Sequence, residues 1–198
     1  LYRTNSQSRI FEEYLRRYNV AYKVFGGLSF YQRKEVKDLL GYLRLTVNKR
    51  DEEALKRVLN YPRRGIGKTT IDKISAMAAE TGKTMWECLQ LVKASAKATT
   101  AISNFVKAIM SFTRKAENSN AYEVAILVAK NSGLIAEMQK DQTLEGLGRI
   151  ENVNALLDGV KEFVENDEII DEATMPDKTI TSYLQNIALH TNMDSEAE

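Results

Sequence analysis

One short stretch, rich in glycine and basic residues, constrains the fold of this 198-residue chain more than any other. It reads Tyr-Pro-Arg-Arg-Gly-Ile-Gly-Lys-Thr-Thr over residues 61–70 and contains one of the two prolines and two of the ten glycines. Apolar residues recur at helical spacing on both sides of it. The stretch is therefore predicted to be a tight turn between two helices, with Ile66 anchoring the turn in the core.

This turn has the properties of a phosphate-binding site. Gly65 and Gly67 have no Cβ, so the backbone can take a positive φ and a ligand can approach bare N–H groups. The next helix is predicted to begin directly after them, and the N–H groups of its first turn have no intrahelical partner and attract an anion. Three cations add positive charge. The candidate phosphate-binding residues are Arg63, Arg64, Gly65, Ile66, Gly67, Lys68 and Thr69.

Three interpretations of the turn are open. Residues 67–69 match the end of a nucleotide P-loop, G-x-x-x-x-G-K-[ST], but Pro62 stands where its first glycine belongs, and residues 55–59 have helical rather than strand spacing. A helix–hairpin–helix fits better, because a Gly-hydrophobic-Gly turn can present N–H groups to a DNA phosphate without reading sequence. An ordinary helix C-cap followed by a turn is the third, since glycine is common there.

If the turn binds a phosphate, two substitutions should have different effects. A bulky side chain at Gly67 should block the phosphate, and it should strain the backbone if φ is positive there. Arg64→Ala should leave the fold intact and remove one phosphate contact, which lowers the salt dependence of DNA binding by a slope of about 1.

Composition excludes several classes of protein. Hydrophobic residues make up 43% of the chain, which is enough for a core, and no run of about 18 apolar residues that would span a membrane is present. The first residues do not resemble a signal peptide. A single cysteine, Cys88, rules out an internal disulfide framework and suits a reducing compartment, so we expect a cytoplasmic protein.

The net charge of +1 conceals an asymmetry along the chain. Residues 1–74 contain 17 lysines and arginines against 8 acidic residues, whereas residues 75–198 contain 11 against 19. This pattern indicates that a polyanion meets only the first part. The alternative is two solvated surfaces of opposite sign.

The rest of the chain is predicted to be mainly helical. Ile10, Tyr14 and Leu15 are expected on the inner face of the first helix, and Asp51 and Thr84 are expected to cap later ones. We find no metal-ligand spacing, no recognisable nucleophile–base pair and no internal repeat. The predicted helices cover about 7–18, 33–47, 96–115, 122–131, 144–164 and 178–189, and short strands are predicted at 1–3 and 22–25. Leu147 is expected to face inward from the helix at 144–164.

Three blocks of sequence resemble the UvrD/PcrA/Rep DNA helicases. They cover residues 1–9, residues 26–38 and residues 63–67, in the order and spacing of that family. The resemblance implies two RecA-like motor domains that bind ATP between them, each with an inserted helical accessory domain. It implies that this chain is a strand–helix–strand remnant of the second motor domain (1–30), its helical accessory insertion (31–190) and an acidic linker (191–198).

The resemblance also implies roles for individual residues. Arg3 and Asn5 match a motor-domain block that contacts single-stranded DNA, and residues 64–69 match a hairpin that holds the duplex ahead of the fork. The block at 30–38 is expected to form the joint between motor and insertion, where a rigid-body rotation would occur. The alternative is that its charged residues are structural, and they are not expected to be DNA ligands.

Expectations for partners and cofactors follow from the same resemblance. Duplex and single-stranded DNA are the expected partners, with repair or replication proteins as further ones. ATP and Mg²⁺ belong to the parent helicase, and no Walker A, Asp-Glu or arginine-finger block is present here, so the fragment itself should not hydrolyse ATP. The alternative is that the acidic helical half is a protein-interaction or autoregulatory module and the glycine turn has no DNA role.

Overall fold

The computed structural model describes residues 7–18, 20, 22, 29–166 and 177–195. Within these ranges the chain is helical and contains no strand, as the mainly α prediction requires. The strands predicted at 1–3 and 22–25 fall outside the described residues except for Tyr22, which belongs to no regular element. The elements are α1 (Gln7–Arg17), η1 (Phe30–Gln32), α2 (Lys34–Val47), α3 (Glu52–Val58), α4 (Lys68–Thr81), α5 (Met85–Cys88), α6 (Ala96–Ala116), α7 (Ala121–Asn131), α8 (Leu134–Met138), α9 (Leu144–Glu165) and α10 (Ile180–Ser195).

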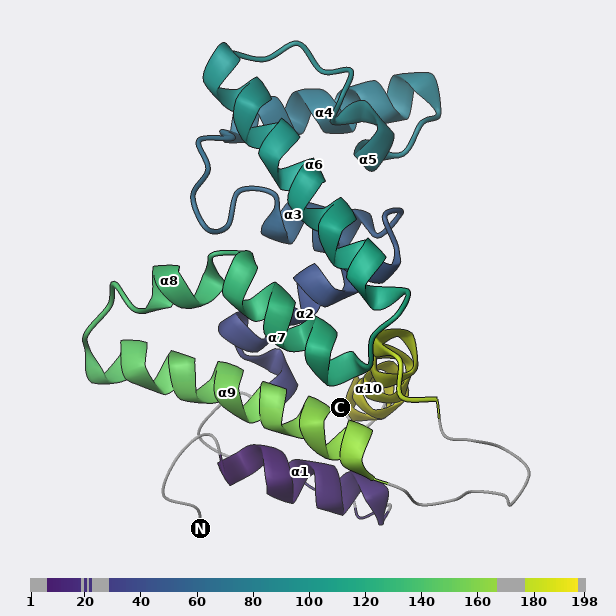
Figure 1. Ribbon diagram of the computed structural model, residues 1–198, viewed down its shortest axis with the longest axis vertical. Helices are drawn as coiled ribbons and strands as arrows, with labels where there is room; N and C mark the ends of the chain where they lie inside the picture. Colours follow the sequence, from purple (N-terminus) through teal and green to yellow (C-terminus); the bar gives the residue numbers. More distant parts are fainter. Residues whose placement is uncertain (1–6, 19, 21, 23–28, 167–176, 196–198) are drawn as a thin grey trace.

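Helix α2 is the central element of the molecule (Figure 1). It packs against α3, α6, α7, α9 and α10, and Leu39, Leu43 and Leu45 are fully buried in these contacts. At Gly41 an added Cβ would lie 3.0 Å from a methyl group of Val58, so this glycine lets α2 and α3 approach closely. The periodic leucines predicted this helix, and the structure confirms it.

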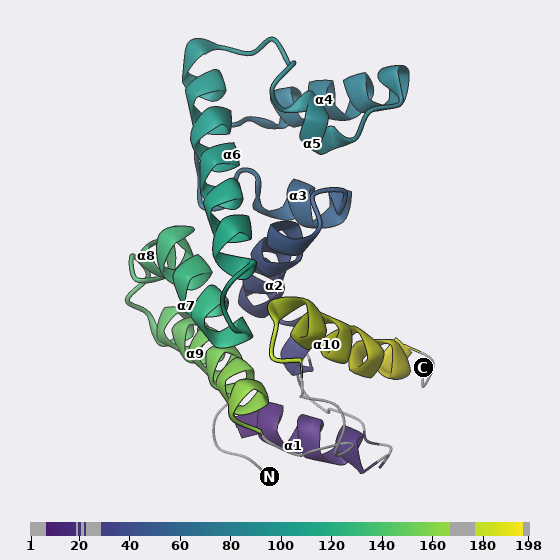
Figure 2. The same ribbon diagram turned by 45° about the vertical axis from the view of Figure 1, so that its right-hand side comes forward.

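Helix α6 runs from one end of the elongated molecule to its middle (Figure 2). Its N-terminal half lies beside α4 and α5 at one end, and its C-terminal half packs on α2 and α7 in the body. Its buried residues Ile102, Phe105, Ile109 and Phe112 form one face at helical spacing. This arrangement leaves the opposite face of α6 exposed along its length.

Side-chain caps set the starts of several helices. Asp51 accepts a hydrogen bond from the N–H of Ala54, and Thr84 and Glu87 form a reciprocal capping box at α5, so both predicted caps are confirmed. Three further starts have the same type of cap, made by Ser95, Asn120 and Thr143.

The prediction for the inner face of α1 is wrong for Ile10 and Tyr14, whereas Leu15 is half-buried. Ile10 and Tyr14 are 48% and 57% exposed, whereas the polar residues Arg9 and Glu12 are buried. The carboxylate of Glu12 accepts hydrogen bonds of 3.1 and 3.0 Å from the N–H of Phe30, which satisfies the buried charge. The side of α1 that packs against the rest of the described chain therefore carries the charged residues Arg9 and Glu12 rather than Ile10 and Tyr14.

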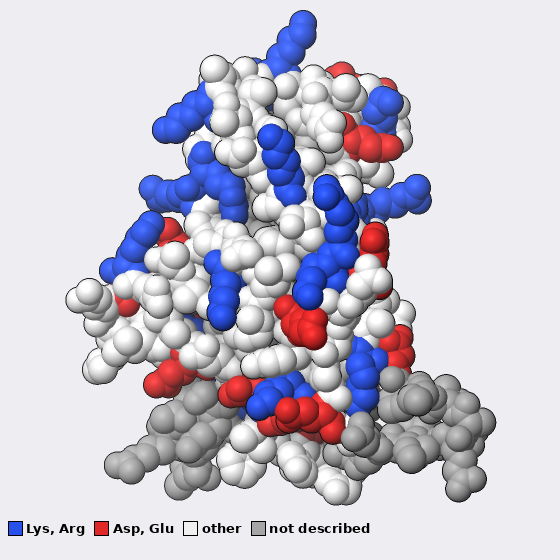
Figure 3. Space-filling view, viewed as in Figure 1, with Lys and Arg blue, Asp and Glu red and all other residues white. Residues whose placement is uncertain are grey.

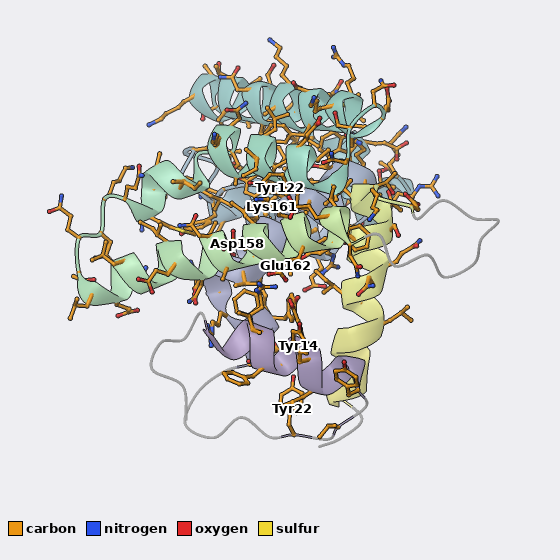
Figure 4. The ribbon with its side chains drawn as sticks, turned by 60° about the horizontal axis from the view of Figure 1, so that its bottom comes forward. Tyr14, Tyr22, Tyr122, Asp158, Lys161 and Glu162 are labelled. Carbon is orange, nitrogen blue, oxygen red and sulfur yellow. The ribbon has the colours of Figure 1, made fainter. Side chains whose placement is uncertain are left out.

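Arg9 joins α1 to α9. Its guanidinium, 3% exposed, contacts Glu13 at 2.7 Å and Glu162 at 3.1 Å, and Figure 4 shows Glu162 on the side of α9 that faces α1. A Cβ on Gly159 would lie 2.7 Å from the Arg9 Nη1 atom. The glycine weakens the interior of α9, but it makes room for this buried cation.

Two other helix predictions need correction. Leu147 was expected to face inward from α9, yet it is 51% exposed, because this turn of α9 lies at the open end of the helix near α8. Helix α10 ends at Ser195 rather than near residue 189, so it continues into the stretch expected to be a linker.

Candidate nucleic-acid interface

The link between α3 and α4, residues 59–67, is called the Gly-Ile-Gly turn below. Helices α3 and α4 each pack on α5 more extensively than on each other, so the turn bridges two separated helix ends. Ile66 is fully buried in the core, which confirms its predicted role as an anchor. Burial of this one side chain fixes the residues on both sides of it at the surface.

Asn60 organises the backbone of the turn. Its Oδ1 atom accepts hydrogen bonds from the N–H groups of Arg64 at 3.0 Å and Ile66 at 3.1 Å. The carbonyl of Gly67 accepts from Thr70 and Ile71 at the start of α4. Four N–H groups around the two glycines and the start of α4 donate to no acceptor in the described part of the chain: those of Gly65, Gly67, Lys68 and Thr69.

The two glycines of the turn have different backbone requirements. Gly65 has φ +83°, the left-handed region that favours glycine, whereas Gly67 has φ −72° and serves as the N-cap of α4. A Cβ on Gly67 would meet no atom within 4 Å. The expectation of backbone strain at Gly67 is therefore wrong, and it applies to Gly65 instead.

The structure also corrects the expectation for Arg64. Its guanidinium lies between elements rather than over the turn, and its ring contacts are with Tyr42 and Phe105, whose centroids lie 5.8 and 5.3 Å from Cζ. It donates to the hydroxyl of Tyr42 and to four backbone carbonyls. These are the carbonyls of Val58 at 3.0 Å, Leu59 at 3.4 Å, Pro62 at 3.1 Å and Ser132 at 3.0 Å.

Arg64 thus ties the turn to α2, to the end of α3 and to the end of α7. Its side chain is occupied within the fold, so removing it should not leave the fold intact. The hydroxyl of Tyr42, which accepts a hydrogen bond from Arg64, also ties the turn to α2, because it donates to the carbonyl of Tyr61 at 2.6 Å. Burial raises the pKa of Tyr42 to about 12, although the charge of Arg64 opposes that shift, so the hydroxyl keeps its proton as a donor.

Three exposed cations surround the free N–H groups. Arg63 precedes Gly65, Lys68 begins α4, and Lys97 reaches over from the start of α6. None of them has an ion-pair partner in the described ranges. Arg63 and Lys97 line an open hollow of about 630 Å³, together with Asn60, Arg64, Gly65 and Gly67, and Lys68 follows Gly67 in the chain.

Lys97 is the site residue that sequence analysis missed. Its Cε atom lies 3.2 Å from where a Cβ on Gly65 would be, although about thirty positions separate the two in the chain. The available signal was the composition of α6, which contains lysine and arginine but no acidic residue. Figure 3 shows basic side chains spread over this half of the molecule.

The other predicted site residues lie elsewhere. Arg3 and Asn5 fall outside the described residues. In the block at 30–38, Arg33 donates to Asn152 at 2.8 Å, and Asn152 donates to Glu35 at 2.5 Å, in a buried network between α2 and α9. These charged side chains therefore hold helices together.

The residues of the turn do not fit a nucleotide phosphate chain. A P-loop follows a buried strand, whereas the helix α3 precedes this turn, and Pro62 stands at the position of the first glycine. Within the described ranges, no group of three or more His, Cys, Asp or Glu side chains is arranged to hold a metal ion. None of the described helices is long and apolar enough to cross a membrane.

Comparison with known proteins places the chain in a family. The model of the UvrD-like helicase C-terminal domain matches residues 1–198. The chain belongs to this UvrD-like helicase family. It is 32% identical over 197 residues to "ATP-dependent DNA helicase PcrA" of Staphylococcus aureus (strain NCTC 8325 / PS 47) and 34% identical over 197 residues to the PcrA helicase of Bacillus subtilis (strain 168).

A further relative is "DNA helicase II" of Salmonella typhimurium, 35% identical over 193 residues. These alignments cover 98%, 98% and 96% of the chain, respectively, but 26% of each relative. The chain thus spans about a quarter of the length of the UvrD-like helicases that it matches.

Proposed function

We propose that this chain is the duplex-binding part of an ATP-dependent DNA helicase, and that the Gly-Ile-Gly turn holds a backbone phosphate of the duplex. The relatives are named as DNA helicases, which supports the partner class. The turn then acts as the centre of a helix–hairpin–helix. Arg63, Gly65, Gly67, Lys68 and Thr69 contact the phosphate, and Ile66 and Arg64 hold the turn in place.

The observation that carries this proposal is the grouping of four free N–H donors with three unpaired cations. Two of the N–H groups lie at the N-terminus of the 14-residue helix α4, where the helix dipole favours an anion. The hollow exposes no large apolar or aromatic side chain that would read or stack on a base. Such a site grips the DNA backbone without sequence preference, which a protein that slides along a duplex requires.

The longer protein supplies the remaining parts of the proposed helicase. Residues 1–30 belong to a motor domain, with Arg3 and Asn5 on single-stranded DNA. Residues 31–190 form the accessory insertion, and 191–198 lead back to the motor. ATP and Mg²⁺ bind outside this fragment, which is inactive alone, and the protein acts in the cytoplasm on DNA in repair or replication.

A salt series of fluorescence anisotropy with duplex DNA tests the role of the turn. The 198-residue chain should bind without sequence preference, with a Kd of roughly 10⁻⁴–10⁻⁶ M at physiological salt. Gly67→Val should weaken binding by blocking the N–H groups, while the melting temperature stays close to that of the wild type because the added side chain meets open space.

The matched control is a double variant that removes two positive charges from residues outside the turn. Arg50 and Lys83 are exposed and both lie near Glu87 at the start of α5. Arg63→Ala/Lys68→Ala should weaken binding more than Arg50→Ala/Lys83→Ala, although both remove two positive charges. Equal effects of the two double variants, together with wild-type binding by Gly67→Val, would show that the turn is only a structural cap and favour the interaction-module alternative.

A further inference from the structure

Helix α6 has an unusual charge composition. It contains Lys97, Lys107, Arg114 and Lys115 among its 21 residues, and no acidic residue. Only Lys115 has an ion-pair partner in the described chain, Glu123 at 3.1 Å. The other three cations are exposed and unpaired, so they are available to an external anion.

These three cations share one side of the helix. At about 100° per residue, Lys97, Lys107 and Arg114 fall within a sector of roughly 100°. The buried residues of α6, among them Ile102 and Ile109, occupy the opposite sector. Lys97, Lys107 and Arg114 therefore form one exposed row, called the α6 ridge below, and Figure 3 shows basic side chains over the face that α6 presents.

The α6 ridge begins at the Gly-Ile-Gly turn. Lys97 lines the hollow of the turn, so the first cation of the ridge is also the third cation of the phosphate site. Seventeen positions separate Lys97 from Arg114, which corresponds to about 26 Å along the helix. A DNA duplex of that length carries about 15 phosphates, because it has one charge per roughly 1.7 Å of its axis.

We propose that the α6 ridge is a second contact surface for the duplex, continuous with the turn and binding the phosphate backbone further along the same DNA. This inference rests on the proposed function of the turn. It assigns Lys97, Lys107 and Arg114 as DNA-binding residues and extends the contact from one phosphate to a track along α6.

The side chains between the cations distinguish duplex DNA from other anionic partners. Thr100, Asn104 and Ser111 occupy the same sector and are exposed, small and polar. A protein partner is usually anchored by large apolar or aromatic residues, and single-stranded nucleic acid by aromatic stacking platforms. The ridge offers neither, whereas hydroxyl, amide and cationic groups are the usual ligands of DNA phosphates.

The test compares three double variants of the 198-residue chain on one duplex of about 20 base pairs, by anisotropy across a salt series. The ridge variant is Lys107→Ala/Arg114→Ala, the turn variant is Arg63→Ala/Lys68→Ala, and the control is Arg50→Ala/Lys83→Ala. Alanine at exposed helical positions preserves helix propensity, so the ridge variant should melt like the wild type.

The ridge variant should lower the slope of log K against log salt by about 1.8, since each neutralised phosphate contributes about 0.9. Between about 50 and 200 mM salt, the wild type should therefore lose roughly 12-fold more affinity than the ridge variant does. The control should change the slope by much less, although its change in net charge is the same.

The outcomes separate the two proposals. A ridge variant that behaves like the control, while the turn variant loses binding, overturns the α6 ridge and leaves the proposed function standing. A turn variant that binds like the control refutes the proposed function of the turn, and the continuous track along α6 fails with it. Reduced slopes for both the ridge and turn variants, beyond the control, support both proposals.

Discussion

Substitution of Arg64 by alanine should destabilise the protein, whereas the same substitution at the neighbouring Arg63 should not. The guanidinium of Arg64 is the only described donor to the carbonyls of Pro62 and Ser132. The carbonyl of Val58, by contrast, also accepts a hydrogen bond from the N–H of Tyr61 at 3.2 Å. The cost of the substitution therefore comes mainly from two acceptors that lose their donor.

The magnitude follows from these two acceptors. A hydrogen bond from a charged group contributes about 1.5–3 kcal/mol, and the lower end applies because Arg64 is partly exposed. Two such bonds correspond to a loss of about 3 kcal/mol in the free energy of unfolding. For a domain of this size, a loss of 1 kcal/mol lowers the melting temperature by about 2–4 °C, so Arg64→Ala should lower it by roughly 6–12 °C.

The assay is thermal or urea unfolding followed by circular dichroism, with Arg63→Ala as the matched control. Arg63 is exposed and has no described partner, so its removal should change stability by less than about 0.5 kcal/mol. In DNA binding, Arg63→Ala should lower the salt slope by about 1. Equal melting of wild type and Arg64→Ala, or a larger loss in Arg63→Ala, would refute the assignment of Arg64 as the residue that ties the turn to α2 and α7.

Three further predictions address the turn and its surroundings. Gly65→Ala should lower stability by about 1–2 kcal/mol, because its φ of +83° disfavours a side chain; a melting curve like that of the wild type would contradict this. Calorimetric titration with ATP and Mg²⁺ should detect no binding, because Pro62 and the preceding helix do not fit a P-loop, and a stoichiometric micromolar site would revive that interpretation. The raised pKa of Tyr42, about 12 against 10.0 for an unperturbed tyrosine, means that the unfolded chain loses this proton first. Stability should therefore fall as pH rises from 10 toward 12, and Tyr42→Phe should flatten this fall in urea melts; an unchanged pH profile would count against it.

Much of the fold could be predicted from the sequence, because its signals are local. The apolar spacing of α2 and the caps at Asp51 and Thr84 depend on neighbours within one or two helical turns, and each is confirmed. The buried Ile66 was predictable for the same reason: an apolar residue between two glycines has few alternatives to burial.

The errors arose where the role of a residue depends on contacts distant in the chain. The apolar residues Ile10 and Tyr14 pointed to an inner face of α1, but the burial of Arg9 depends on Glu162 and on the space left by Gly159. The contribution of Lys97 to the phosphate site likewise depends on α6 returning to the turn. Periodicity within one helix contains no information on either contact.

The turn contains two arginines, Arg63 and Arg64, and two glycines, Gly65 and Gly67, and the two members of each pair have different structural roles. Arg64 and Gly65 shape the turn, one through a guanidinium held by carbonyls of three elements and the other through a positive φ. All four residues line the hollow where the free N–H groups lie, but Arg63 and Gly67 have neither of these constraints. The sequence alone could not show which arginine and which glycine shape the turn. That assignment depends on the hydrogen bonds that Asn60 accepts and on the burial of Ile66.

This division has a physical consequence for the proposed grip on DNA. N–H groups bind a phosphate well only if they keep their positions when the anion arrives, because rearranging the turn would cost part of the binding free energy. The half-buried guanidinium of Arg64 fixes the turn before any ligand is present, and it does so without using the cations that the ligand needs. Variants of Arg64 should therefore weaken DNA binding through the loss of a preorganised backbone, with the salt slope nearly unchanged, whereas variants of Arg63 should lower the slope at constant stability.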